Sequence, residues 1–226
     1  MEIFEGYIIN ITPYKEYDCI FTLITPEKNI TVKARNLYKN SSPYQLLVKD
    51  LNKVKIECYK GPLNYLMLRG GDIVLNFYDF ILNNNFYLLY YELMKELLHK
   101  FYNPEDNSLY YKLIEETCLR VKKNNDKRFI LSFVITILRL NGVFKKFDSV
   151  DDIKQTVIDS NFQILDSFLD KKEMNDIINI QNLKYIGISN YNLAGSIDKI
   201  IIFYLRLLEI NTSTKIKSID LLKIHL

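Results

Sequence analysis

The sequence predicts an α+β protein, in which an N-terminal β-barrel packs against a C-terminal α-helical bundle. In residues 1 to about 78, short segments alternate between apolar and polar positions, which is typical of strands. After Asn83 the apolar spacing becomes helical, and start and stop signals bound the later segments. We therefore expect a barrel domain at residues 1–80 and a helical domain at residues 81–226.

Five segments have the composition and alternation of strands, and so many short strands in so little chain predict a small closed barrel. "TPEKN" and "KGPLN" supply hairpin turns, and Gly70-Gly71 predicts a bulge or bend in the last segment. The predicted strands are residues 5–12, 19–25, 30–34, 53–60 and 63–77.

The helical half begins with a segment whose apolar residues recur at helical spacing. The helix at 126–140 is apolar nearly all round and stops at Asn141-Gly142, which predicts a place at the centre of a bundle. For residues 143–169 we favour a hairpin turning at Ser160-Asn161 over two short helices. The other predicted helices are 86–101, 105–123, 169–182 and 196–211, the last with Ser196 as its N-cap.

The positive charge is concentrated in one part of the chain. Net charge is only +3, yet residues 28–69 contain nine Lys and Arg against Asp50 and Glu57. Such a window favours a polyanionic partner such as nucleic acid. The alternative is a Lys-rich, solvated sheet face.

The sequence indicates a cytoplasmic protein. Cys19, Cys58 and Cys118 are odd in number and far apart, so they imply no disulfide framework. We see no secretory signal, and the longest apolar stretches, 129–138 and 200–208, are too short to span a bilayer.

Residues for catalysis are few, which favours a binding protein over an enzyme. His99 and His225 are the only histidines, so a histidine triad or a multi-histidine metal site is nearly excluded. There is no phosphate-binding glycine loop, and adjacent acid pairs such as Asp151-Asp152 face different ways on a helix. We expect no catalytic residue, cofactor or metal.

The N-terminus, "EGYIINITPYKEYDCIFTLITPEKN", resembles the RecO-type DNA repair proteins, which are bacterial recombination mediators. The family pattern is a Gly-led strand, an elbow with Tyr, Glu and Asp, and a strand ending in Leu-x-Thr. "VKARNLYKNSSPY" is similar to the family's basic loop, and "LLEINTSTKIKSIDLL" to its closing helix and Lys-Ser-x-x-x-Leu. The matching positions are Gly6, Tyr14, Glu16, Asp18, Leu23, Thr25, Ala34, Arg35, Lys39, Ser42, Lys217, Ser218 and Leu222.

The resemblance implies an OB-fold barrel on a helical bundle and a function without bond chemistry. Such proteins bind single- and double-stranded DNA and anneal complementary strands. With RecR they load RecA onto strands coated by single-stranded DNA-binding protein (SSB). Residues 143–169 lack the cysteines that hold zinc in many members, so we expect a zinc-less insert. Asn36 replaces the usual loop Gly, and Gly70-Gly71 is not part of the family pattern.

The resemblance and the charge together select candidate DNA contacts. Arg35 and Lys39 are the first candidates for phosphate, in a loop that we expect to be mobile until DNA orders it, and Lys33 should share the face of Arg35. Tyr38 and Tyr44 are candidates for base stacking, with hydrogen-bonded packing as the alternative. The weaker basic candidates are Lys28, Lys53, Lys55 and Arg69.

Two acids of the elbow and a basic cluster of the helical domain have other expected roles. Glu16 and Asp18 would repel phosphate, so we interpret them as acceptors for backbone N–H groups in the elbow. A basic cluster near the second helix junction could bind the acidic SSB tail, although a solvated turn explains it as well. The cluster comprises Arg120, Lys122, Lys123, Lys127 and Arg128.

Two other functions remain open. A nucleic-acid-modifying enzyme that grips its substrate with an OB domain would need carboxylates converging in the helical domain. A protein-interaction adaptor whose barrel binds a peptide would bind with little dependence on salt.

Overall fold

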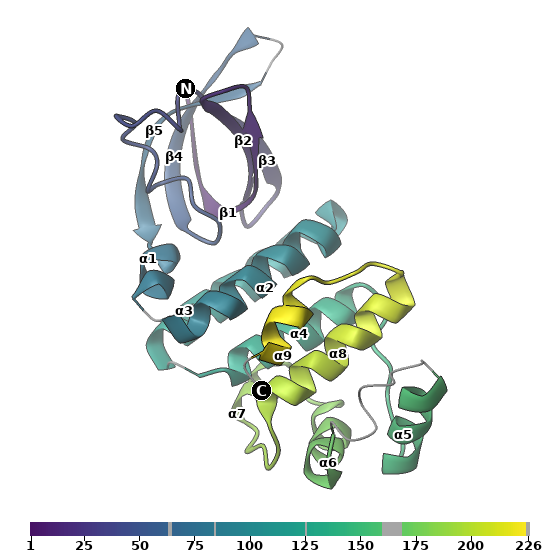
Figure 1. The fold of residues 1–226 in the computed structure, drawn as a ribbon. Helices are drawn as coiled ribbons and strands as arrows, with labels where there is room; N and C mark the ends of the chain where they lie inside the picture. Colours follow the sequence, from purple (N-terminus) through teal and green to yellow (C-terminus); the bar gives the residue numbers. More distant parts are fainter. Residues whose placement is uncertain (63–64, 84, 125, 160–168, 225–226) are drawn as a thin grey trace. The chain divides into compact units, whose positions relative to one another are not determined.

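The N-terminal part of the chain is a closed barrel of five strands (Figure 1). The computed structural model describes every residue except 63–64, 84, 125, 160–168 and 225–226. The strands are β1 (Glu2–Tyr14), β2 (Asp18–Ile24), β3 (Asn29–Ala34), β4 (Lys53–Lys60) and β5 (Leu66–Leu75). Their order around the barrel is β1-β2-β3-β5-β4, and β3 and β5 form the parallel pair. The predicted closed barrel is therefore confirmed.

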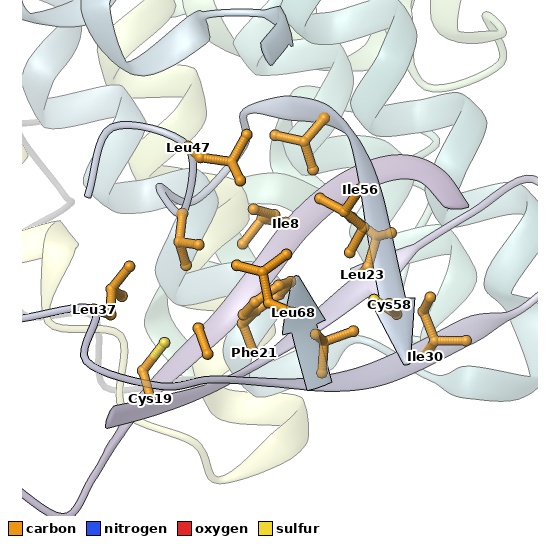
Figure 2. Close-up of a cluster of buried hydrophobic side chains, with 14 residues drawn as sticks. Ile8, Cys19, Phe21, Leu23, Ile30, Leu37, Leu47, Ile56, Cys58 and Leu68 are labelled. Atoms are coloured by element: carbon orange, nitrogen blue, oxygen red, sulfur yellow. The ribbon is translucent and has the colours of Figure 1, made fainter. Parts of the chain in front are cut away.

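Alternation of side chains along β2, β3 and β4 fills the barrel. In β2, Cys19, Phe21 and Leu23 are fully buried, whereas Ile20 and Thr22 between them are only partly buried. Figure 2 shows such side chains converging from several strands and from the connection between β3 and β4. The core comprises Ile8, Cys19, Phe21, Leu23, Ile30, Val32, Ala34, Leu37, Leu47, Val48, Val54, Ile56, Cys58 and Leu68.

The bulge expected in the last strand is present. Glu57 faces Gly70 while Cys58 faces Leu68, so Arg69 is the extra residue of β5. At Gly71 a Cβ atom would lie 2.5 Å from the Lys55 carbonyl oxygen, so only glycine fits this close approach of two strands.

Helices make up most of the remaining chain. The segments predicted at 86–101, 105–123, 126–140, 169–182 and 196–211 correspond to α2, α3, α4, α6 and α8. The helices are α1 (Phe77–Leu82), α2 (Asn85–Phe101), α3 (Asn107–Asn124), α4 (Arg128–Leu140), α5 (Val150–Asp159), α6 (Lys171–Ile180), α7 (Tyr185–Asn190), α8 (Ile197–Thr212) and α9 (Ser218–Ile224).

Helix α4 is buried on every side, as its composition predicts. Every residue from Phe129 to Ile135 is buried, and α4 contacts both α7 and α8. The helix ends at Leu140 with Asn141 as its C-cap, and Gly142 follows with φ +69°, a left-handed conformation that glycine adopts without strain.

The hairpin expected within residues 143–169 is wrong in its first arm. Residues 150–159 form α5, in which Ile153 and Val157 are buried one helical turn apart. The helical spacing of these two buried residues, rather than the β-branched content of the segment, decides that residues 150–159 form a helix. The expected turn at Ser160-Asn161 lies outside the described residues.

Contacts divide the chain into two compact units, residues 1–122 and 123–226. The expected boundary at residue 80 marks the change from strands to helices, but it does not coincide with the division between the units. Contacts from α3 to the barrel explain the difference: the Lys53 Nζ lies 2.9 Å from a Glu115 carboxylate oxygen, and the Tyr7 and Tyr111 rings meet edge to face. None of the described helices is long and apolar enough to cross a membrane.

Candidate nucleic-acid interface

A groove on the barrel surface brings together two of the predicted basic residues. We call it the barrel groove; its volume is about 240 Å3. Arg35, just after β3, is exposed and contributes positive charge, whereas the Lys33 side chain of β3 is 17% exposed and its ammonium lies 3.4 Å from the Asp18 carboxylate. The groove is lined by Tyr14, Ile20, Lys33, Arg35, Pro62, Tyr65 and Met67.

Strand register explains how these distant residues meet. Lys33 lies opposite Ile20 of β2 on one side and opposite Met67 of β5 on the other, and all three side chains belong to the groove. Tyr14 ends β1, whereas Tyr65 immediately precedes β5. The groove therefore crosses β2 and β3 between the β1–β2 elbow and the β4–β5 connection.

Two tyrosines give the groove exposed aromatic surface. Tyr14 is 40% exposed and Tyr65 is 51% exposed. The Lys33 ammonium lies 4.1 Å from the centroid of the Tyr14 ring, a cation–π contact that holds the lysine along the groove wall. A groove that combines cationic groups with partly exposed tyrosine side chains suits a ligand with both phosphates and bases.

Asp18 connects the groove to the loop that follows. Its carboxylate accepts a hydrogen bond from the Asn36 N–H at 2.9 Å and lies 3.4 Å from the Lys33 ammonium. Burial alone would raise the pKa of Asp18, but the Asn36 hydrogen bond and the charges of Lys33 and Arg35 hold that pKa below its usual value.

The elbow prediction is confirmed for Asp18 and wrong for Glu16. Asp18 accepts a hydrogen bond from a backbone N–H, that of Asn36, as expected. Asn36 adopts φ +55°, so it keeps the turn in which the family usually has glycine. Glu16 is exposed, and its carboxylate instead interacts with the Tyr17 hydroxyl, which raises the pKa of that tyrosine.

Hydrogen bonds hold the loop between β3 and β4 at both ends, and Arg35 and Lys39 within it are exposed as expected. The Tyr38 N–H donates to the Tyr17 carbonyl at 3.0 Å. At the far end, the Asn52 side chain donates to the Leu46 carbonyl and accepts from the Phe77 N–H at 3.0 Å. Both ends of the loop are thus fastened to neighbouring elements.

Within this loop the two predicted stacking residues differ. Tyr38 is 42% exposed, so part of its side chain is accessible to a ligand. Tyr44 is half-buried against the barrel core, and its hydroxyl donates to the Arg69 carbonyl at 2.6 Å. Tyr44 therefore has the packing role that was the alternative. Lys39 is exposed, with its ammonium 5.5 Å from the centroid of the Tyr17 ring.

Lys53 has an internal role instead of the expected DNA contact. Its ammonium lies 2.9 Å from a Glu115 carboxylate oxygen and 3.2 Å from one of Glu5. Burial opposes the charge, but hydrogen bonds with Glu115, Tyr111 and Glu5 raise the pKa of Lys53. Two carboxylates thus already neutralise this lysine.

The other basic candidates on the barrel are exposed but do not line the groove. Lys28 lies in the β2–β3 turn, 5.8 Å from the centroid of the Phe4 ring. Lys55 belongs to β4, and Arg69 is the bulged residue of β5.

A second cavity lies where the β3–β4 loop faces α1 and α2; we call it the loop pocket. Its volume is about 440 Å3. Burial raises the pKa of Asp50 at its wall, although Lys95 and a hydrogen bond from the Ile11 N–H oppose the shift. The pocket is lined by Ile11, Leu37, Tyr38, Gln45, Val48, Lys49, Asp50, Tyr78, Tyr91, Glu92 and Lys95.

The proposed SSB-tail residues do not form one described site. Arg120 and Lys122 belong to the first compact unit, whereas Lys123, Lys127 and Arg128 belong to the second. The Lys127 ammonium lies 2.8 Å from Asp198, and the Arg128 guanidinium lies 2.6 Å from Asp126. These ion pairs favour the structural interpretation of both residues.

Sequence reasoning missed Tyr14 and Tyr65 as groove residues. Tyr14 was noticed only as part of the elbow, and Tyr65 gives no local signal because it reaches the groove through the pairing of β5 with β3. An exposed tyrosine beside a strand end is the available hint, but this chain has 17 tyrosines.

The described residues thus define an α+β protein with a closed five-stranded barrel that carries a basic, tyrosine-lined groove. Comparison with known protein families and with curated protein sequences finds no match to this chain. Across the described residues, no group of three or more His, Cys, Asp or Glu side chains is placed to hold a metal ion.

Proposed function

We propose that this protein binds single-stranded DNA in the barrel groove and acts as a recombination mediator. The observation that carries the proposal is the groove itself, where the exposed Arg35 lines one surface with Lys33 and with the partly exposed Tyr14 and Tyr65. In OB-folds, the face of strands 2 and 3 and the loops 1–2 and 4–5 bind oligonucleotides. The barrel groove occupies the equivalent position, and the strand order is compatible with an OB-fold.

The finer function rests on the resemblance to RecO-type proteins. We propose that the protein also binds double-stranded DNA, anneals complementary strands, and helps RecR load RecA onto SSB-coated DNA in the cytoplasm, without catalysis. Arg35 matches the arginine of the family's basic loop, and it lines the groove, which supports this proposal. Lys39, four positions further along the same loop, is exposed and adds positive charge to this surface.

The first test is binding of a fluorescent single-stranded oligonucleotide over a salt series. We compare the wild type with Arg35→Glu/Lys39→Glu. Each phosphate contact on a single strand contributes about −0.7 to the slope of log K against log salt. Loss of two contacts should weaken binding and make the slope shallower by about 1.4.

Lys28→Glu/Lys55→Glu is the matched control, because it reverses two charges on exposed lysines of the same barrel outside the groove. Its slope should stay close to that of the wild type. Absence of binding at low salt would overturn the proposal, and equal losses in the control would move the site elsewhere on the barrel. Binding of peptides that salt does not weaken would favour an adaptor instead.

A further inference from the structure

Tyr38 gives the loop pocket an exposed aromatic side chain. Of its three tyrosines, Tyr78 and Tyr91 each have a lysine ammonium over the ring, Lys49 at 5.1 Å and Lys95 at 5.0 Å. Tyr38 is the tyrosine with substantial exposure, and it lies in the loop rather than on a helix. A planar ligand entering the pocket would therefore meet the Tyr38 ring.

Asp50 supplies a hydrogen-bond acceptor at a fixed position in the pocket wall. Its side chain is only 18% exposed. Its backbone carbonyl accepts from the Tyr91 hydroxyl at 3.0 Å, and its carboxylate accepts from the Ile11 N–H. The Lys95 ammonium is 4.0 Å from the Asp50 carboxylate and 3.1 Å from that of Glu92, so the Asp50 carboxylate keeps acceptor capacity for a ligand.

The pocket also lies within reach of a strand bound in the barrel groove. Arg35 lines the groove and Tyr38 lines the loop pocket, and the two residues are three positions apart. Three residues of chain extend at most about 11 Å. A single strand leaving the groove beside Arg35 covers that distance within a few nucleotides.

We propose that the loop pocket receives one unstacked base of the bound single strand and favours bases that carry an amino group. This inference rests on the proposed function. The base stacks on Tyr38, its amino group donates to the Asp50 carboxylate, and Lys49 and Lys95 lie near the adjoining phosphates. A carboxylate accepts from the N4 amino group of cytosine, whereas thymine presents an oxygen and a methyl group at the same edge.

The test compares binding of oligo-dC and oligo-dT of equal length to the full chain. A hydrogen bond to a charged acceptor corresponds to about a tenfold difference in affinity, so oligo-dC should bind about tenfold more tightly. Replacing both hydrogens of the cytosine amino group by methyl groups should remove this advantage without any change to the protein. Tyr38→Leu should weaken binding of both oligonucleotides.

Asp50→Asn should reduce the preference to about twofold or less, because an amide can either accept from cytosine or donate to thymine. Glu27→Gln is the control: Glu27 is an exposed carboxylate of the β2–β3 turn that lines neither the loop pocket nor the barrel groove, so this variant should keep the preference. Equal wild-type affinity for oligo-dC and oligo-dT, or an unchanged preference in Asp50→Asn, would overturn the inference and leave the proposed function standing. Failure of both oligonucleotides to bind at low salt would instead overturn the proposed function.

Discussion

Asp18 is the residue on which the barrel groove and the β3–β4 loop both depend. It accepts the Asn36 N–H and pairs with Lys33. We expect Asp18→Ala to lower the free energy of unfolding by about 1 kcal/mol, because it removes one hydrogen bond to a backbone N–H and one ion pair. Urea denaturation measures this change. Glu16→Ala, two positions away in the same elbow, should have almost no effect.

The stabilisation by Asp18 should depend on pH in a defined direction. Its pKa is lower in the folded protein than in the unfolded chain, so its contribution is complete above the unfolded pKa of about 4. The contribution is lost as pH falls through the lower, folded pKa. In urea titrations, the difference between wild type and Asp18→Ala should therefore shrink below about pH 4. A difference that stays constant down to lower pH would contradict this assignment.

Residue roles were predictable where a local pattern determines them. The Asp18 acceptor and the Lys33–Arg35 pair follow from an elbow and from alternation along one strand. The ion pair of Lys53 with Glu115 was not predictable, because Glu115 lies 62 positions away and no short-range pattern indicates it. The sequence alone therefore could not distinguish a lysine that contacts DNA from one that pairs with carboxylates elsewhere in the fold.

At the scale of elements, two buried carboxylates of α6 hold the start of α8. The Asp176 carboxylate accepts from the Ala194 and Gly195 N–H groups at 2.9 and 2.8 Å. The Glu173 carboxylate accepts from the Ser196 N–H at 2.8 Å and completes a capping box with Asp170. The segment 194–196 thus obtains its backbone hydrogen bonds from side chains.

Asp176→Ala should lower the free energy of unfolding by about 2–4 kcal/mol, since two backbone N–H groups lose their acceptor. Thermal or urea denaturation followed by circular dichroism measures the loss. Asp176→Asn keeps one acceptor oxygen and should cost less. Asp151→Ala removes a carboxylate that is 90% exposed and should change stability by less than about 0.5 kcal/mol. A similar loss in the Asp151 variant would show that the buried hydrogen bonds are not the cause.

Gly6 permits the close approach of β1 and β2. A Cβ atom there would lie 2.2 Å from the Ile24 carbonyl oxygen, which belongs to the backbone and cannot rotate away. Gly6→Ala should therefore destabilise the barrel by about 2–3 kcal/mol in urea denaturation. At Gly70 the same added atom meets nothing within 4 Å, so Gly70→Ala should change stability by less than about 1 kcal/mol. Equal effects at the two positions would contradict the steric argument.

Long or strongly periodic elements were predictable from the sequence, and short ones were not. The strands of the barrel and helices α2, α3, α4, α6 and α8 follow from alternation, helical spacing and caps. The segment at α5 contains β-branched residues that favour a strand, and packing of its apolar face overrides that preference. α1, α7 and α9 span only 6 or 7 residues, so packing rather than periodicity decides them.

For the whole molecule, cysteine labelling distinguishes two possible divisions of the chain. Burial raises the pKa of the Cys19 thiol to about 12 and that of Cys58 to about 11, and Cys118 is shifted in the same direction. All three thiols lie in residues 1–122. We expect them to resist iodoacetamide in the native protein and to become reactive together as urea is increased.

Mass spectrometry of the labelled protein gives the urea midpoint for each cysteine. If Cys118 were labelled at a lower urea concentration than Cys19 and Cys58, α3 would unfold separately from the barrel, and a boundary near residue 80 would describe the chain better. Helix loss by circular dichroism also reports on residues 123–226, which contain no cysteine. Its midpoint need not coincide with that of labelling, because two units can unfold independently.

The fastened β3–β4 loop has a consequence for the kinetics of binding. Hydrogen bonds at Tyr38 and Asn52 already hold the segment that carries Arg35, Lys39 and Tyr38. Binding then requires no prior ordering of the loop, so diffusional encounter of protein and DNA should limit the association rate. The association rate constant should consequently fall as ionic strength rises, in step with the screening of the basic surface.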